Sequence, residues 1–116
     1  VVLEEVIKES IKDVDGIFLS VDIDVVDPGS APGTGTPEPG GLSSRQLLDA
    51  VRKISVELPV VGMDVVEVAP AYDHAEITAL LANRVVLEAL SGIALRKKNL
   101  QNGQVFNYSQ SLLKDR

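Results

Sequence analysis

The segment DPGSAPGTGTPEPGG, residues 27–41, limits the possible fold more than any other part of the sequence. Its four prolines and five glycines exclude a helix or a strand there, because proline lacks a backbone N–H and glycine is costly to order. The preceding residues, IFLSVDIDVV (17–26), have the β-branched and apolar content of a strand buried on both faces. A long loop that directly follows a buried strand is typical of the functional edge of an α/β sheet.

The same order of strand and loop returns later in the chain. VVGMDVVEV (60–68) has the apolar density of a second buried strand, and it leads into the proline-containing loop APAYDH (69–74). Helices are predicted at residues 2–12, after Ser43, and at about 75–95. The order helix, strand, loop, helix, strand, loop, helix predicts an α/β fold with right-handed parallel crossovers.

Two of these helices have capping signals at their start. Ser43 and Gln46 have the spacing of a capping box, and Asp73 can cap the third helix with Glu76 three residues later. The third helix is apolar on most sides, so we expect it to be largely buried. The residues from Lys97 onward show no apolar pattern, which predicts a tail or a weakly ordered helix.

The composition excludes several classes of protein. The chain has 116 residues and no cysteine, which excludes a disulfide scaffold, a zinc finger and a thiol nucleophile. Its net charge of −6 argues against nucleic acid or an anionic membrane as partner, because either requires a basic surface. No apolar run approaches the roughly 20 residues that span a bilayer, and the first residues lack the pattern of a signal peptide. We therefore expect a soluble cytoplasmic domain.

Two parallel strands alone would leave both edges of the sheet unpaired. Parallel sheets survive where they are wide and covered on both faces, so the chain is expected to be incomplete by itself. Its first residue, valine rather than methionine, agrees with that expectation.

Asp22 and Asp24 are the strongest candidates for chemistry. In a strand, residues two apart point to the same face, so the two carboxylates would project together from an apolar segment. Paired carboxylates are costly to desolvate unless a cation lies between them, and their oxygens suit Mg²⁺, Ca²⁺ or Mn²⁺. The alternatives are a solvated pair beyond the strand end, or neutralisation by arginine or lysine. Asp27, before a proline, is interpreted as the start of a turn.

Glu67 is the second candidate, near the end of the other strand. A glutamate in this apolar segment needs a cationic partner or ligand, and a guanidinium matches a carboxylate with two hydrogen bonds. The alternative is an internal ion pair with an arginine, for which the sequence offers Arg45, Arg52 or Arg84. Asp64 would face the other side of the strand from Glu67, which favours a structural role.

Other polar residues give weaker signals. His74, the single histidine, is either a pocket residue or a surface side chain at the start of a helix. Ser43, Ser44 and Thr34 have no histidine base near them in sequence, which argues against a serine triad. The glycines of the first loop match neither a P-loop nor a dinucleotide fingerprint.

Three segments in this order resemble the ureohydrolase family of arginases, agmatinases, guanidinobutyrases and guanidinases. They are SVDIDVVDP, APGTGTPEPGGLSSRQL and GMDVVEVAPAYD, within a match that extends from about Val14 to Lys97. The sequences GTGTPEPGG and PAYDHAEITAL are most similar to the agmatinase-like branch. The resemblance implies a three-layer α/β/α fold with a mostly parallel sheet.

The resemblance also implies a site with two Mn²⁺ ions, or Ni²⁺, at the strand ends. By this resemblance Asp22 bridges the two metal ions, Asp24 chelates one of them, and Glu67 holds the substrate guanidinium. The ions would supply hydroxide at neutral pH, and its attack on a guanidino compound would give urea and an amine. The other implied substrate-binding residues lie in the two loops: Thr34, Gly35, Thr36 and His74.

The chain also departs from the family pattern. The family's histidines in its GGDHS and DAHxD segments are absent, and two aspartates cannot complete two shells of about six ligands each. We therefore expect residues 1–97 to be the C-terminal part of a ureohydrolase domain, inactive alone and without its own catalytic residue, and 98–116 to be a polar tail. The alternative is a truncated, non-catalytic segment that serves assembly. The family implies a homo-oligomer, and the substrate stays open among agmatine, guanidinobutyrate, guanidine and arginine.

Overall fold

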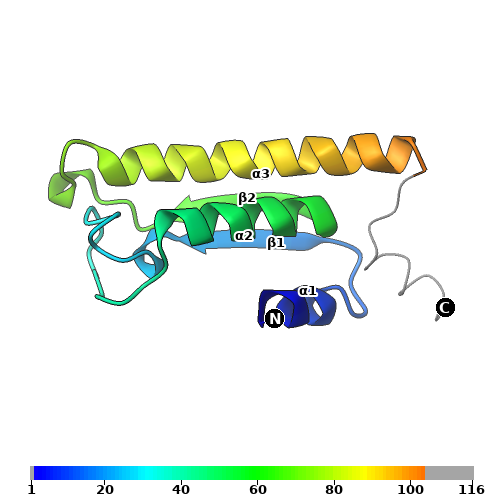
Figure 1. The fold of residues 1–116 in the computed structure, drawn as a ribbon, viewed down its shortest axis with the longest axis horizontal. Helices are drawn as coiled ribbons and strands as arrows, with labels where there is room; N and C mark the ends of the chain where they lie inside the picture. Colours follow the sequence, from blue (N-terminus) through cyan, green and yellow to red (C-terminus); the bar gives the residue numbers. More distant parts are fainter. Residues whose placement is uncertain (1, 104–116) are drawn as a thin grey trace.

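The computed structural model describes residues 2–103, which form one α/β unit (Figure 1). Three helices, two strands and two short 3₁₀ helices follow one another in the predicted order of helices and strands. Their bounds are α1 Val2–Ser10, β1 Ile17–Asp22, η1 Ile23–Val25, α2 Ser44–Glu57, β2 Val60–Val66, η2 Pro70–Tyr72 and α3 Ile77–Gln101.

The strands β1 and β2 pair in parallel, as predicted, and two helices cover one face of their sheet. Leu19 and Val21 of β1 and Met63 and Val65 of β2 form this covered face with apolar residues of α2 and α3. The helices α2 and α3 lie along each other over the sheet (Figure 1). The core therefore lies between the sheet and a single helical layer.

The other face of the sheet is uncovered, so the prediction of strands buried on both faces is wrong within residues 2–103. Phe18 is 62% exposed and Val66 is 36% exposed, and Ser20 and Asp64, which pair across the sheet, are both exposed. No described element covers these side chains. The apolar density of the strands nevertheless fits a sheet with a layer on each side.

Both strands end earlier than predicted. The expected strand 17–26 ends at Asp22, and the expected strand 60–68 ends at Val66. Beyond β1 the chain turns at once into η1, where the Asp22 side chain accepts a hydrogen bond from the backbone N–H of Asp24 at 3.1 Å. A short polar side chain that accepts a hydrogen bond from a nearby backbone N–H competes with the hydrogen bonds between strands, which explains why β1 ends at Asp22.

The predicted capping is confirmed at the start of α2 and only in part at the start of α3, where Glu76 is itself the N-cap residue and makes no side-chain cap hydrogen bond. In α2, Ser43 and Gln46 form the predicted capping box. The helix α3 begins at Ile77 rather than 75, and the Asp73 carboxylate accepts hydrogen bonds from the backbone N–H groups of Thr78 and Ala79 at 3.0–3.1 Å. Because α3 continues to Gln101, the first residues of the predicted polar tail are helical, and 104–116 lie outside the described residues.

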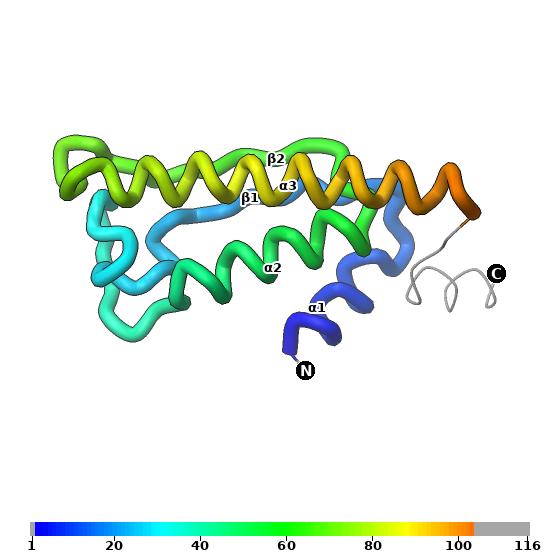
Figure 2. The backbone as a smooth tube through the Cα atoms, turned by 45° about the horizontal axis from the view of Figure 1, so that its top comes forward, coloured from blue at the N-terminus to red at the C-terminus, as the bar shows by residue number. Residues whose placement is uncertain are grey.

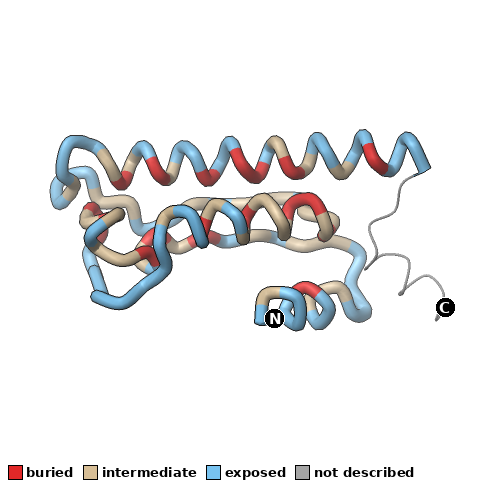
Figure 3. The backbone as a smooth tube through the Cα atoms, in the orientation of Figure 1, coloured by how far each residue is buried: buried red, intermediate tan, exposed pale blue. Residues whose placement is uncertain are grey.

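Only one side of α3 is buried, which corrects the prediction of a largely buried helix (Figure 3). Leu80, Leu87 and Leu90 of α3 are 50–62% exposed. By length and composition α3 could also cross a membrane, whereas the sequence suggested that no segment approaches that length. The charged residues Arg84 and Glu88 interrupt its apolar run, and the ion pair between Glu88 and Arg52 of α2 joins the two helices.

Candidate active site

Three carboxylates lie where the two parallel strands end. Asp22 is the last residue of β1 and pairs across the sheet with Val66, the last residue of β2, which Glu67 directly follows. Asp24 lies two residues beyond Asp22, in η1. We refer to Asp22, Asp24 and Glu67 as the strand-end carboxylates. They share the carboxyl edge of a parallel sheet, where α/β proteins place their binding sites.

Asp22 and Asp24 are half-buried and have no cationic partner within residues 2–103. In the described part of the chain, the Asp22 carboxylate accepts a hydrogen bond only from the backbone N–H of Asp24, and the Asp24 carboxylate accepts one from the Thr36 hydroxyl at 2.8 Å. Neutralisation by arginine or lysine, one of the alternatives, is therefore absent from the described chain. The pair does not alternate along a strand as predicted, because Asp24 belongs to η1.

Glu67 has an unusual backbone and an exposed side chain. Its φ of 68° lies in the left-handed region, which non-glycine residues rarely adopt. Strain of this kind is concentrated at binding and catalytic sites. Here it occurs at the first residue after β2.

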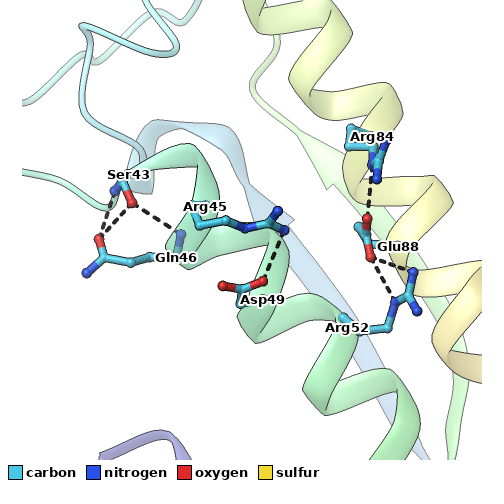
Figure 4. Close-up of polar contacts among 7 residues, drawn as sticks. All are labelled: Ser43, Arg45, Gln46, Asp49, Arg52, Arg84 and Glu88. Atoms are coloured by element: carbon cyan, nitrogen blue, oxygen red, sulfur yellow. Dashed lines mark hydrogen bonds and ion pairs between the residues drawn. The ribbon is translucent and has the colours of Figure 1, made fainter.

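The three arginines that could pair with Glu67 contact other carboxylates (Figure 4). Arg45 pairs with Asp49 at 3.0 Å within α2. Arg52 and Arg84 both pair with Glu88, at 2.7 and 2.9 Å. The alternative of an ion pair between Glu67 and one of these arginines is therefore wrong, and the Glu67 carboxylate has no ion pair within the described residues.

Asp27 starts a turn, as predicted, and also closes the long loop 27–41. One carboxylate oxygen accepts the backbone N–H of Gly29 at 2.8 Å, and the other accepts that of Gly40 at 2.9 Å. These two hydrogen bonds, from Gly40 first and Gly29 second, hold the pKa of Asp27 below its ordinary value. The two ends of the loop are thus joined through one ionised side chain.

The loops that follow β1 and β2 lie at the same end of the molecule and are hydrogen-bonded to each other (Figure 2). Ala69 donates its backbone N–H to the carbonyl of Gly33 at 2.7 Å, and Gly33 donates its own to the buried Thr78 hydroxyl at 2.8 Å. A Cβ at position 33 would lie 2.7 Å from the Cβ of Asp73, so only glycine fits without displacement. Gly33 and Thr78 gave no motif in the sequence, since their contact spans 45 positions.

The other predicted substrate residues have different surroundings. Thr34 is 2% exposed, and its hydroxyl has no hydrogen-bond partner in the described chain. Gly35 and Thr36 are exposed in the same loop, with open space around Gly35. His74 is exposed, and its backbone N–H donates to Asp73. Their contacts with substrate stay predictions.

The donor set fits part of a metal site. Carboxylate oxygens are the ligands that hard divalent cations prefer, and Asp22 and Asp24 are half-buried without a cationic partner. Among residues 2–103, however, no group of three or more histidine, cysteine or acidic side chains could hold a metal ion. The two aspartates can therefore supply some ligands of such a site, and further ligands would have to come from elsewhere.

Comparison with known proteins identifies the family. The model of the arginase family matches residues 1–92. The chain belongs to the arginase family. The predicted family and the predicted arginase-like α/β fold are thereby confirmed, with the described chain forming part of that fold.

Individual relatives in the arginase family give the same result. Over 74 residues the chain is 55% identical to "Proclavaminate amidinohydrolase" of Streptomyces clavuligerus, covering 64% of this chain and 23% of the relative. Over 81 residues it is 56% identical to "Agmatinase" of Edwardsiella ictaluri, and this match covers 70% of this chain and 26% of the relative. The crystal structure of formimidoylglutamase from Bacillus subtilis superposes on this chain with a TM-score of 0.77 at 39% sequence identity. The superposition covers 81% of this chain and 30% of the formimidoylglutamase chain. The chain thus spans about a quarter of the length of these curated relatives.

Proposed function

We propose that this chain contributes part of the active site of a metal-dependent ureohydrolase that hydrolyses a guanidino compound, such as agmatine, to urea and an amine. The observation that carries the proposal is the group of strand-end carboxylates, which share one edge of a parallel sheet and lack cationic partners within residues 2–103. Membership of the arginase family supports the reaction class. Relatives named agmatinase and proclavaminate amidinohydrolase support an amidine or guanidine substrate.

In this proposal Asp22 and Asp24 hold divalent cations. Manganese suits their oxygen ligands best, and nickel is also compatible. Two such ions would lower the pKa of a water molecule enough to make hydroxide available near neutral pH. Each ion requires about six ligands, so we propose that the remaining ligands lie in sequence upstream of this chain.

Glu67 is proposed to bind the substrate guanidinium. A carboxylate accepts two parallel hydrogen bonds from the planar guanidinium, which fixes the plane of the group as well as its position. The side chain is exposed and has no arginine partner within residues 2–103, so it is available for that contact. Holding the guanidinium carbon beside the nucleophile accounts for much of the rate in such a reaction.

The loop residues Thr34 and Gly35 are proposed to line the substrate pocket, with His74 near the outer end of the substrate. The Thr34 hydroxyl, which is buried and has no hydrogen-bond partner among residues 2–103, supports this, because an unsatisfied buried hydroxyl is costly and a bound polar group would satisfy it. We also propose that the full-length protein is cytoplasmic, assembles as a homo-oligomer such as a trimer or hexamer, and has no nucleic-acid or membrane partner.

A second candidate function is a non-catalytic segment that serves assembly. The exposed leucines of α3 and the uncovered sheet face favour it, since both faces need a cover. The two candidate functions can be distinguished by the sequence upstream of Val1. The catalytic function requires that the family segments with the metal-binding histidines precede Val1 in the same reading frame. A stop codon or unrelated sequence before Val1 would favour assembly.

The direct test is release of urea by the full-length protein supplied with Mn²⁺ and a panel of guanidino compounds. We expect Asp22→Ala and Asp24→Ala each to lower the turnover by about 1,000-fold or more, because each removes a metal ligand. The matched control is Asp64→Ala, an exposed aspartate in the middle of β2. Turnover by Asp22→Ala equal to that of the Asp64→Ala control would contradict the proposal.

A further inference from the structure

Thr36 contacts one of the proposed metal ligands from the far side of the long loop. Its Oγ1 donates a hydrogen bond of 2.8 Å to Oδ2 of Asp24, twelve positions away in the sequence. Within residues 2–103, no other side chain donates a hydrogen bond to Asp22 or Asp24. The resemblance to the ureohydrolases implies that Thr36 binds substrate, which stays a prediction; the partner observed in the structure is a carboxylate of the protein.

The loop is fixed in a way that keeps this hydroxyl in place. On one side of Thr36, two hydrogen bonds fix Gly33: its carbonyl accepts the backbone N–H of Ala69, and its own N–H donates to the Thr78 hydroxyl. On the other side, the backbone N–H of Gly40 donates to the Asp27 carboxylate. Thr36 therefore lies in a short segment anchored on both sides, and its hydroxyl reaches Asp24 without depending on a bound ligand.

We propose that Thr36 is a positioning residue that fixes the Asp24 carboxylate for metal binding. The hydrogen bond occupies Oδ2, so Oδ1 stays available to a divalent cation in a defined orientation. Hydrogen-bond donors to metal ligands restrict the orientation of the ligand before the ion arrives, and losing one typically weakens metal affinity by about 10–100-fold. This inference rests on the proposed function, since it requires Asp24 to be a metal ligand.

The experiment measures the affinity of the metal-free full-length protein for Mn²⁺ by calorimetric titration. Thr36→Val keeps the shape of the side chain but removes the hydroxyl, and we expect it to weaken binding of one Mn²⁺ by about 10-fold or more. Thr36→Ser keeps a hydroxyl and should restore affinity close to the wild type. The Tm of the metal-free variants should stay within about 2 °C of the wild type, because position 36 is exposed.

Unchanged Mn²⁺ affinity in Thr36→Val would overturn the positioning role. If that variant instead showed a raised KM with normal Mn²⁺ binding, Thr36 would contact the substrate, as the sequence suggested. Asp24→Asn separates this failure from failure of the proposed function. If Asp24→Asn loses Mn²⁺ while Thr36→Val does not, only the positioning role is wrong. If Asp24→Asn also binds Mn²⁺ like the wild type, Asp24 is not a ligand and both proposals fail for this residue.

Discussion

The carboxylates of the helical layer and those of the sheet edge have opposite surroundings. Glu88 of α3 has a side chain that is only 7% exposed, and two arginines bind it, Arg52 from α2 and Arg84 from one turn earlier. The hydrogen bond from Arg84, with the charge and hydrogen bond of Arg52, holds the pKa of Glu88 below its ordinary value despite its burial. The strand-end carboxylates have no such partner within residues 2–103, although Asp22 and Asp24 are half-buried.

This difference separates structural charges from those available to a ligand. A buried charge is tolerated when it is paired, and α2 and α3 are joined at such a pair (Figure 4). At the sheet edge, hydrogen bonds from Asp24 N–H and Thr36 orient the aspartates without neutralising them. Within residues 2–103, Arg52 and Arg84 pair with Glu88 at the contact between α2 and α3, and the strand-end carboxylates have no cationic partner.

Apart from the substitutions of the proposed metal ligands Asp22 and Asp24, the largest expected effect comes from removing the negative charge of Glu67. We expect Glu67→Gln to lower turnover of a guanidino substrate by roughly 100- to 1,000-fold, comparable to the loss of one aligned electrostatic partner in other active sites. Mn²⁺ binding should be unchanged, because Glu67 is assigned to the substrate. An assay of urea release and a titration with Mn²⁺, carried out on the same preparation of the Glu67→Gln variant, measure the loss of turnover and the metal binding.

Glu76→Gln is the matched control for this substitution. Glu76 is also an exposed glutamate with a positive φ, 59°, but it lies at the start of α3 rather than at the strand end. The control should keep near wild-type turnover. Equal losses in the two variants would mean that strained glutamates near the loops act only through local structure.

The next largest effect concerns the contact between the two loops. Gly33→Ala should destabilise the full-length protein by about 2 kcal/mol, because its Cβ would meet Asp73 and Thr78 at 2.7–2.9 Å. Gly35→Ala, which meets nothing within 4 Å, should change the unfolding free energy by less than about 0.5 kcal/mol. Denaturant unfolding compares the two, and equal stability would contradict the tight packing at Gly33.

The smallest effect tests the paired carboxylate itself. Because the folded pKa of Glu88 is lowered, its contribution to stability is present above its unfolded pKa of about 4.5 and is lost as the pH falls through the lower folded value. Glu88→Gln should therefore lower the Tm by a few degrees at pH 7 and by less at pH 3. Asp49→Asn, which breaks the exposed pair with Arg45, is the control and should shift the Tm little at either pH. A shift for Glu88→Gln that does not depend on pH would show that its charge is not what stabilises the helices.

Much of this architecture follows from local sequence signals. The capping box of Ser43 and Gln46, the turn at Asp27 and the parallel pairing of two apolar strands each depend on short-range patterns, and all are observed. The strand ends do not follow from such patterns. The strand β1 ends at Asp22 because the Asp22 side chain accepts a hydrogen bond from the backbone N–H of Asp24, and apolar composition alone does not predict that hydrogen bond.

The long-range contacts and the uncovered faces could not be predicted from the pattern of residues. The hydrogen-bond partners of Thr36, Gly33 and Arg52 lie 12 to 45 positions away in the sequence, so these pairs can be identified only in the folded chain. The burial of α3 was overestimated for a different reason. An apolar side chain such as Leu87 indicates that a face can be covered, yet Leu87 is 50% exposed within residues 2–103.

The most direct test of cation binding by Asp22 and Asp24 is the stoichiometry of Mn²⁺ binding to the metal-free full-length protein and to its Asp22→Ala variant. If these two aspartates, which have no arginine partner within residues 2–103, bind cations, the wild-type chain binds two Mn²⁺ ions. Asp22→Ala should then lose at least one of them, whereas Glu88→Gln should bind both. Two ions bound with wild-type affinity by the Asp22→Ala variant would contradict cation binding by Asp22.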